Sequence, residues 1–236
     1  MTVRAGLLIV GHVDERSRHV AGDYPELFSA LLAPVGVEVV PYSAETGELP
    51  ASLSECDGWL CSPSRSSVYD DEPWIAGVEA VLRAVVAEDR PFVGICFGHQ
   101  LLAQALGGRV ERAPGGWGVG VQEYELLEPL PAAGAVSADH YALIASHQDQ
   151  VVAVPDALRV TARSGYCPVA GLAASDRVWT LQAHPEFVPA LADHLLAGRV
   201  ELIGAERVAT ARASLAHATD SALIARAIAA TFGAPV

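Results

Sequence analysis

The sequence has no long hydrophobic run, few cysteines and few basic residues. A helix that crosses a bilayer needs roughly 18 or more consecutive apolar residues, and the apolar stretches of this 236-residue chain are much shorter. Fifteen basic residues against 28 acidic residues give a formal net charge of −13, which argues against nucleic-acid backbones and anionic membrane surfaces as partners. We therefore expect neither a membrane nor a nucleic acid as a partner.

The cysteine content points to a reducing compartment. The chain has four cysteines, without the density of a disulfide scaffold or the spacing of a zinc site. The apolar stretch at residues 5–10 is too short for the hydrophobic region of a signal peptide, and Asp14 and Glu15 lie where a small-residue cleavage site would be. These features predict a cytoplasmic protein.

Motifs for a metal or a phosphate-bearing cofactor are also missing. The glycine-rich run at residues 114–120 is followed by an alternating pattern typical of a strand, whereas a phosphate cradle needs the N-terminus of a helix. No histidine pair has a metal-ligand spacing such as H-E-x-x-H. We expect no metal and no cofactor.

Apolar strands alternate with amphipathic helices in the first half of the chain. This alternation predicts an α/β fold, with a doubly wound, mostly parallel central sheet and helices on both faces. Such folds bind ligands at the C-terminal edge of the sheet. The expected strands are residues 5–10, 36–41, 57–61 and 91–95, and the expected helices are residues 24–33 and 72–88.

The second half of the chain has a different pattern. Short or alternating apolar stretches predict a small antiparallel extension at residues 119–127, 141–146, 158–164, 168–172 and 178–182. Helical sequence follows at residues 189–196 and in a long alanine-rich segment at about 206–232. Because no linker composition interrupts the chain, we expect a single domain over residues 1–236.

Cys96 is the best candidate for a nucleophile. It follows the expected strand at 91–95, has Gly94 and Gly98 two residues to either side, and precedes a stretch with helix-forming composition. Glycines at these positions indicate a sharp turn that cannot accept bulky neighbours. The helix N-terminus beneath the sulfur favours the thiolate. The remaining cysteines are expected to be structural or inert, namely Cys56, Cys61 and Cys167.

A thiolate nucleophile needs a base and a group that orients the base. His184 directly follows the expected strand at 178–182, so it is predicted to lie at the same sheet edge as Cys96. Glu186 lies two residues further, and Pro185 stiffens the connection so that the carboxylate can turn back onto the imidazole. The polar residues 146–151 follow another apolar strand, and they form either a substrate-contacting loop or a plain polar turn.

Four segments together resemble one family. Residues 94–100, the glycine pair 107–108, residues 146–151 and residues 182–186 are similar to motifs of the class I (triad) glutamine amidotransferases. The subgroup resembled is that of stand-alone proteins similar to the glutaminase domain of GMP synthase. Residues 67–74 and 116–120 are similar to further landmarks of that subgroup, and the likeness runs in order from about residue 5 to about 232.

The resemblance implies a flavodoxin-like fold and a Cys-His-Glu triad. It assigns Cys96 as the nucleophile, His184 as the general base and acid, and Glu186 as the orienting carboxylate. It places the glutamine substrate against Gln100 and a loop whose members are Ser146, His147, Gln148 and Asp149.

The resemblance also implies an oxyanion hole, and here the sequence departs from the family. One donor is the backbone N–H of Phe97, and the other comes from a loop in which a Gly-Gly pair is usual. In this chain that loop contains Pro63, which has no N–H, so Ser64 is the expected second donor. The departure leaves open how strongly this hole stabilises an oxyanion.

Three functions remain open. The first is a glutaminase that releases ammonia through a γ-glutamyl thioester and passes it to a synthetase partner carrying the acceptor. The second is a γ-glutamyl peptidase or hydrolase that uses the same triad with water as the only acceptor. The third is a non-catalytic regulatory or binding domain of the same fold, against which the intact Cys96, His184 and Glu186 argue.

Overall fold

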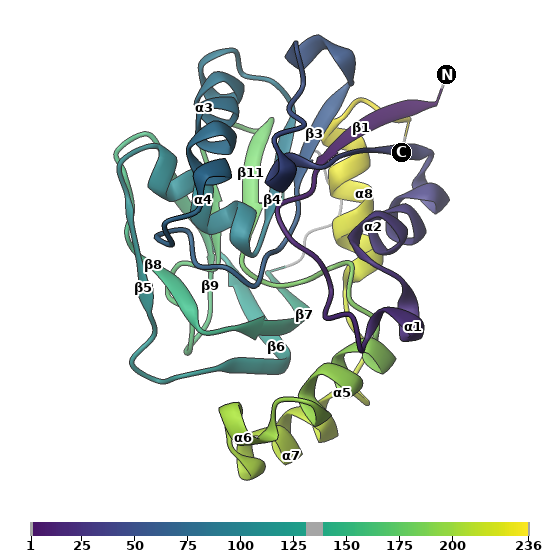
Figure 1. Cartoon of the computed structure of the whole chain (residues 1–236), viewed down its shortest axis with the longest axis vertical. Coiled ribbons are helices and arrows are strands. Elements are labelled where there is room, and N and C mark those ends of the chain that lie inside the picture. The colour runs from purple at the N-terminus through teal and green to yellow at the C-terminus, as the bar shows by residue number, and fades with distance from the viewer. Residues whose placement is uncertain (1, 131–138, 236) are drawn as a thin grey trace.

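A mixed sheet forms the centre of the molecule (Figure 1). In a computed structural model that describes residues 2–130 and 139–235, the sheet has nine strands in the order β2-β1-β3-β4-β11-β10-β9-β6-β7. The first five strands pair in parallel. They are β1 (Val3–Leu8), β2 (Val37–Tyr42), β3 (Gly58–Cys61), β4 (Phe92–Ile95) and β11 (Val178–Leu181).

The other strands are antiparallel and extend the sheet beyond β11. They are β10 (Gly171–Ala173), β9 (Arg159–Arg163), β6 (Gly118–Leu126) and β7 (His140–His147). A separate two-stranded ladder joins β5 (Arg109–Arg112) to β8 (Asp149–Ala153). Neither β5 nor β8 was expected from the sequence, but the predicted fold class is confirmed.

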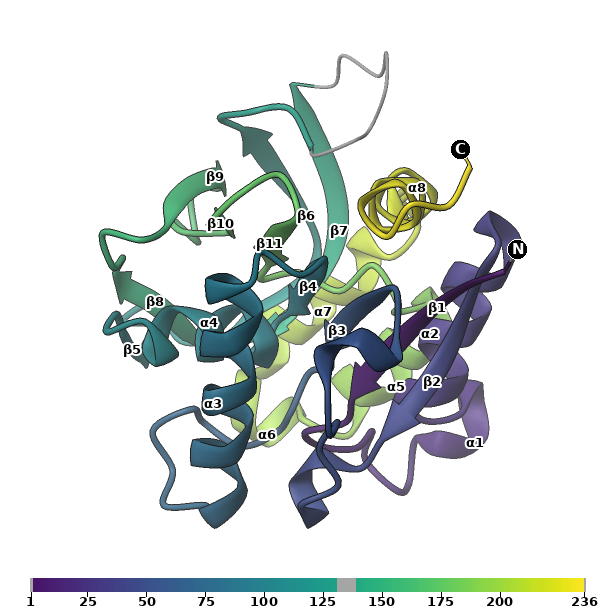
Figure 2. The ribbon, with the colours of Figure 1, turned by 90° about the horizontal axis from the view of Figure 1, so that it is seen from above.

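Helices cover both faces of the parallel part of the sheet (Figure 2). Alternate strand residues point to opposite faces, so Leu7 joins one hydrophobic cluster and Leu8 the other. The first cluster includes residues of α2 (Tyr24–Leu32) and α8 (Ser221–Thr231). The second includes residues of α3 (Pro73–Ala87) and α4 (Phe97–Ala105).

The remaining helices are short and lie towards one end of the molecule (Figure 1). They are α1 (Arg18–Ala21), α5 (Pro189–Ala197), α6 (Val200–Ile203) and α7 (Ala205–Ser214). Among the described residues, no helix combines the length and the hydrophobicity needed to cross a bilayer. The single domain over residues 1–236 stays a prediction, because it includes residues outside the described ranges.

The alanine-rich segment at 206–232 is two helices, so the prediction of one long helical segment is wrong. Helix α7 ends at Ser214 and α8 begins at Ser221. Asp220 explains the break, because its backbone N–H donates to the carbonyl of Ala142 at 2.8 Å and its carboxylate accepts from the N–H of Ala142 at 2.7 Å. These two bonds hold the chain against β7 and redirect it.

Candidate active site

Cys96 occupies a strained backbone turn between β4 and α4. Its φ of 52° and ψ of −96° are unusual for a residue with a side chain. The Cys96 N–H donates to the carbonyl of Leu181 at 2.8 Å, and the carbonyl of Cys96 accepts from the N–H of Gln100 at 3.1 Å. The predicted sharp turn is therefore present, and the neighbouring strand and the following helix hold it.

The two glycines beside Cys96 are required by close packing. A Cβ atom at Gly94 would lie 2.7 Å from the carbonyl oxygen of Gly98. A Cβ atom at Gly98 would lie 2.8 Å from both the Cβ and the carbonyl oxygen of Cys61. Neither glycine has a positive φ, so the constraint is the approach of β3 and α4 to the turn.

Replacing Gly98 by alanine is expected to lower the free energy of unfolding by about 1–3 kcal/mol, because the added methyl group must displace the backbone of β3. Urea unfolding followed by circular dichroism measures this change. The matched control is Gly165→Ala, since no atom lies within 4 Å of a Cβ built there. Equal unfolding midpoints for the two variants would contradict the packing argument.

His184 and Glu186 form a buried pair at the same sheet edge as Cys96. Strand β11 pairs in parallel with β4, with Leu181 opposite Ile95, so the residues that follow both strands are neighbours. The Nδ1 atom of His184 lies 2.8 Å from the Oε1 atom of Glu186. Both side chains are buried, and the expected return of the carboxylate onto the imidazole is present.

The charge of His184 depends on its neighbours. Burial disfavours the imidazolium, but the carboxylate of Glu186 and the sulfur of Cys96 outweigh this effect and raise the pKa of His184 to about 10. Within the described residues, the Nε2 atom of His184 has no hydrogen-bond partner. Because Nδ1 faces Glu186, Nε2 is the atom available for proton transfer.

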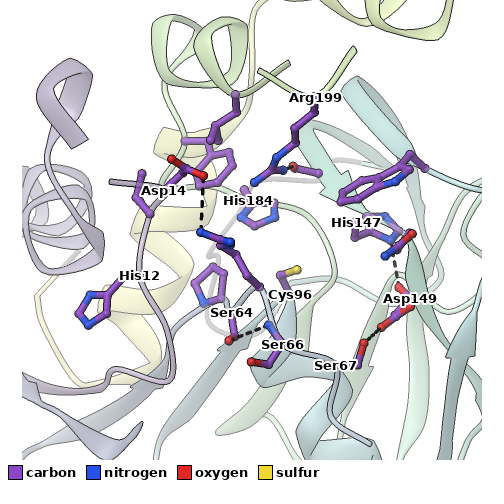
Figure 3. A pocket seen from close by; sticks show the side chains of 18 of the residues that line it. His12, Asp14, Ser64, Ser66, Ser67, Cys96, His147, Asp149, His184 and Arg199 are labelled. Atoms are coloured by element: carbon purple, nitrogen blue, oxygen red, sulfur yellow. Dashed lines mark hydrogen bonds and ion pairs between the residues drawn. The ribbon is translucent and has the colours of Figure 1, made fainter. Parts of the chain in front are cut away.

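A cavity of about 370 Å³ opens over Cys96 (Figure 3). It is bordered by the loop after β3, by the ends of β7 and β8, and by residues of α5 and α6. Glu186 does not line the cavity itself, and its carboxylate contacts the Nδ1 atom of His184. The expected site residues that line the cavity are Ser64, Cys96, Gln100, Ser146, His147, Gln148, Asp149 and His184.

The segment expected as a loop is mostly strand. Ser146 and His147 end β7, and Asp149 begins β8. Ser146 and His147 are extended because β7 pairs with β6, and the part from Asp149 onward is extended because β8 pairs with β5, a strand that was not expected from the sequence. Its position beside Cys96 agrees with the expectation, while its secondary structure does not.

The buried polar groups of this segment are partly unpaired. Burial lowers the pKa of His147 to about 4, so its imidazole is neutral at pH 7. The hydroxyl of Ser67 donates to Oδ2 of Asp149 at 2.5 Å. In the part of the chain that the structure describes, the Oδ1 atom of Asp149 and the Nε2 atom of His147 have no partner.

Gln182 belongs to the site but was not selected as a site residue from the sequence. Its Nε2 atom lies 3.6 Å from the sulfur of Cys96, and its Oε1 atom accepts a hydrogen bond from Gln100 at 3.0 Å. Gln100 also donates to the carbonyl of Asp149 at 2.8 Å. The signal was its position two residues before His184, at the end of a strand beside β4.

The loop that carries Ser64 has a defined conformation. The hydroxyl of Ser62 accepts from the N–H of Val10 at 3.0 Å, and a Cβ atom at Gly11 would lie 2.9 Å from the Cα atom of Ser64. The hydrogen bonds of the described residues include no acceptor for the backbone N–H of Ser64 or Phe97. Both groups are therefore available as donors, and their role in an oxyanion hole stays a prediction.

Three further cavity residues were not selected as site residues from the sequence. Tyr24 comes from α2, Trp117 precedes β6, and Arg199 lies between α5 and α6. They are far apart in the chain. Trp117 lies in the family landmark at residues 116–120, whereas Tyr24 and Arg199 belong to none of the motifs that predicted the site. The packing of α5 and α6 beside the sheet edge brings Arg199 to the cavity, whereas α2 and the segment before β6 bring Tyr24 and Trp117.

His99 is a packing residue. Its Nδ1 atom lies 2.8 Å from the hydroxyl of Thr180 and its Nε2 atom 3.2 Å from the carbonyl of Val169, and burial lowers its pKa to about 3. Among residues 2–130 and 139–235, no group of three or more His, Cys, Asp or Glu side chains is placed to hold a metal ion. The three other cysteines are buried and free.

Comparisons with known proteins identify the family of the chain. The sequence model of the family "Glutamine amidotransferase class-I" matches residues 28–200. Gamma-glutamyl peptidase 2 of Arabidopsis thaliana is 26% identical over 72% of this chain and 70% of that protein. A GMP synthase (glutamine-hydrolyzing) of Aeropyrum pernix is 34% identical over 70% of this chain, but over only 31% of that longer protein.

Solved structures show the same fold. The crystal structure of a glutamine amidotransferase from Thermotoga maritima superposes with a TM-score of 0.76 at 17% identity, covering 98% of this chain and 96% of that one. A glutamine amidotransferase from Methylobacillus flagellatus gives a TM-score of 0.68 at 20% identity, covering 98% of this chain and 93% of that one. The resemblance expected from the motifs is confirmed, and the chain belongs to the class I glutamine amidotransferases.

Proposed function

We propose that the chain cleaves γ-glutamyl amides by acyl transfer to Cys96. The observation that carries this proposal is that the strained Cys96 and His184 line one cavity at one sheet edge, with the buried carboxylate of Glu186 against Nδ1 of His184. A nucleophile, a base and a group that orients the base are the minimum set for such a transfer.

The first half of the reaction forms a thioester. The thiolate of Cys96 attacks the side-chain amide carbon, and the backbone N–H groups of Phe97 and Ser64 stabilise the oxyanion. The imidazolium of His184 gives its Nε2 proton to the leaving nitrogen as the C–N bond breaks. The amine departs, and the γ-glutamyl group remains on sulfur.

The second half returns the enzyme to its starting state. Neutral His184 takes a proton from water, and the resulting hydroxide attacks the thioester carbonyl. The C–S bond breaks, glutamate is released and the thiolate of Cys96 forms again beside the imidazolium. The carboxylate of Glu186 stabilises that imidazolium and fixes the ring orientation.

The γ-glutamyl group itself is held on the side of the cavity formed by Asp149 and Gln100. The buried carboxylate of Asp149, with its unpaired Oδ1 atom, suits the α-ammonium group of the substrate. His147 and Gln148 complete this wall, and Ser146 lies next to them where it accepts a hydrogen bond from Arg199.

Glutamine is the simplest such substrate, and its leaving group is ammonia. The likeness to GMP synthases supports a glutaminase that passes ammonia to a separate synthetase partner. A second candidate is a γ-glutamyl peptidase, which the likeness to the Arabidopsis peptidases favours. Both use the same thioester, so comparing turnover of glutamine with that of γ-glutamyl dipeptides distinguishes them.

Reaction of the protein with an electrophilic glutamine analogue tests the shared chemistry. Intact-mass spectrometry is expected to show one covalent adduct, which is lost in Cys96→Ala and retained in Cys56→Ala, since Cys56 does not line the cavity. Absence of the adduct in the unmutated protein would instead support a non-catalytic binding or regulatory domain.

A further inference from the structure

The guanidinium of Arg199 faces the cavity from the turn between α5 and α6 (Figure 3). Its carbon Cζ lies 5.6 Å from the ring centroid of Trp117. Its Nη1 atom donates to the hydroxyl of Ser146 at 3.2 Å. The aromatic ring and the hydroxyl fix the direction of the guanidinium and leave some of its five N–H donors for another acceptor.

Arg199 has no carboxylate partner among residues 2–130 and 139–235, where no ion pair within 4.0 Å includes it. The nearby Asp14 pairs with Arg65 at 3.5 Å. Arg199 is partly buried, and this burial lowers its pKa. A desolvated cation without a counter-ion is costly, so an anionic group of the ligand is its natural partner.

The position of Arg199 relative to His184 indicates which part of the ligand it meets. His184 must reach the leaving nitrogen to protonate it, so the leaving group lies on the His184 side of Cys96. In Figure 3, Arg199 lies above Cys96 and beside His184, whereas Asp149 lies to the right of Cys96, away from His184. The α-ammonium and α-carboxylate of the γ-glutamyl group share one carbon, so both lie near Asp149.

We propose that Arg199, with Trp117 and Ser146, binds a carboxylate on the leaving amine of the substrate. The preferred substrates are then γ-glutamyl amino acids, and free glutamine is a poorer one. This inference rests on the proposed acyl transfer to Cys96. The amino group of the released amino acid takes a proton from His184. Water then attacks the thioester carbonyl, as in the proposed mechanism.

Three substrates that share the γ-glutamyl group test the inference. γ-Glutamylglycine has a carboxylate on the leaving amine, γ-glutamylethylamide has an uncharged leaving chain, and glutamine releases ammonia. Arg199→Met is expected to lower kcat/KM for γ-glutamylglycine by about 10- to 100-fold, the usual effect of losing a charged hydrogen bond. For the other two substrates kcat/KM is expected to change by less than about twofold, because they lack the carboxylate.

Arg199→Lys and Arg226→Met provide the controls. Lysine keeps the positive charge, so partial recovery of γ-glutamylglycine turnover is expected. Arg226 is exposed on α8 and does not line the cavity, so its variant is expected to match the unmutated protein on all three substrates. Thermal unfolding establishes that each variant is folded.

Four outcomes would overturn the inference. An equal loss of kcat/KM on all three substrates in Arg199→Met would indicate that Arg199 binds the α-carboxylate of the γ-glutamyl group. An unchanged kcat/KM for γ-glutamylglycine would show that Arg199 does not bind this substrate. If Cys96 reacts with the electrophilic glutamine analogue, the proposed function survives either result. Absence of both adduct and turnover would end the two proposals together. If the adduct forms without turnover, the experiment instead measures how strongly γ-glutamylglycine slows formation of the adduct at Cys96. Equal slowing in Arg199→Met and in the unmutated protein would overturn the inference.

Discussion

Replacing Cys96 by alanine is expected to lower the hydrolysis of glutamine and γ-glutamyl dipeptides on the order of 10⁴-fold or more. Alanine cannot form the thioester, so water must attack the amide directly in a cavity built to place a sulfur there. Glutamate release in a coupled assay measures the loss. Substrate binding is expected to persist, because the groups proposed to hold the γ-glutamyl part are unchanged.

Cys56→Ala is the matched control, since Cys56 is buried but lies outside the cavity. This variant removes a sulfur from the core and is expected to keep its activity while losing some stability. If Cys96→Ala retained more than about a tenth of the unmutated rate, thioester chemistry at this residue would be excluded.

Local sequence signals predicted the turn at Cys96 well, because its requirements are local. A parallel strand that ends in a tight turn needs small residues where the next helix approaches, and Gly94 and Gly98 are two residues from the cysteine. In the structure, a Cβ atom added at either glycine would lie less than 3 Å from a backbone carbonyl oxygen. His184 and Glu186 were predictable for a related reason, since a strand end fixes their place on a parallel sheet.

The walls of the cavity were less predictable, because long-range packing builds them. Ser146 and Asp149 were expected in one loop, but they end one strand and begin another, since β8 pairs with β5. The short four-residue strand β5 has two arginines and a glutamate and carries little hydrophobic pattern. Its sequence therefore does not predict the pairing with β8.

Arg199 is a proposed functional residue that could not be predicted from the sequence, also because long-range packing positions it. An arginine after a glycine at the end of a helix is most simply read as a solvated residue. Its contacts with Trp117 and Ser146 bring together residues 82 and 53 positions away in the chain (199 − 117 and 199 − 146). A local pattern does not encode such a cluster, whereas the folded chain places the charge of Arg199 in the cavity that Cys96 also lines.

The loop after β3 was partly predictable. The sequence identified Pro63 as a residue without an N–H, which leaves Ser64 as the candidate donor. It did not predict the bond from the Val10 N–H to the Ser62 hydroxyl, which joins the loop to the segment after β1. That bond crosses between neighbouring strands of the sheet and holds the loop beside Cys96.

Replacing Glu186 by glutamine is expected to lower kcat by about 10³- to 10⁴-fold, as loss of the orienting carboxylate does in comparable triads. The amide retains the size of the carboxylate, but it cannot hold the imidazolium by charge. Glutamate release at saturating substrate measures the change. Glu206→Gln, at an exposed position of α7, is the matched control and is expected to leave kcat unchanged.

The pH dependence of kcat distinguishes an effect of the Glu186 charge on His184 from a purely structural role of Glu186. In the unmutated protein Glu186 raises the pKa of His184 to about 10 against the effect of burial, so the imidazolium persists well above pH 7. Without the carboxylate, burial dominates and the pKa falls, so the alkaline limb of the kcat profile is expected at lower pH in Glu186→Gln. An alkaline limb at the same pH in both proteins would contradict the assignment.

The pH dependence of the free energy of unfolding is a second measurement of the effect of Glu186 on the pKa of His184. Because the pKa of His184 is raised from 6.5 to about 10 in the folded state, the folded protein binds more protons than the unfolded chain between these values. The stabilisation from His184 is fully present below pH 6.5 and is lost as the pH rises towards about 10. In Glu186→Gln this decline is expected to be smaller, so urea unfolding at pH 7 and pH 9 should differ less than in the unmutated protein.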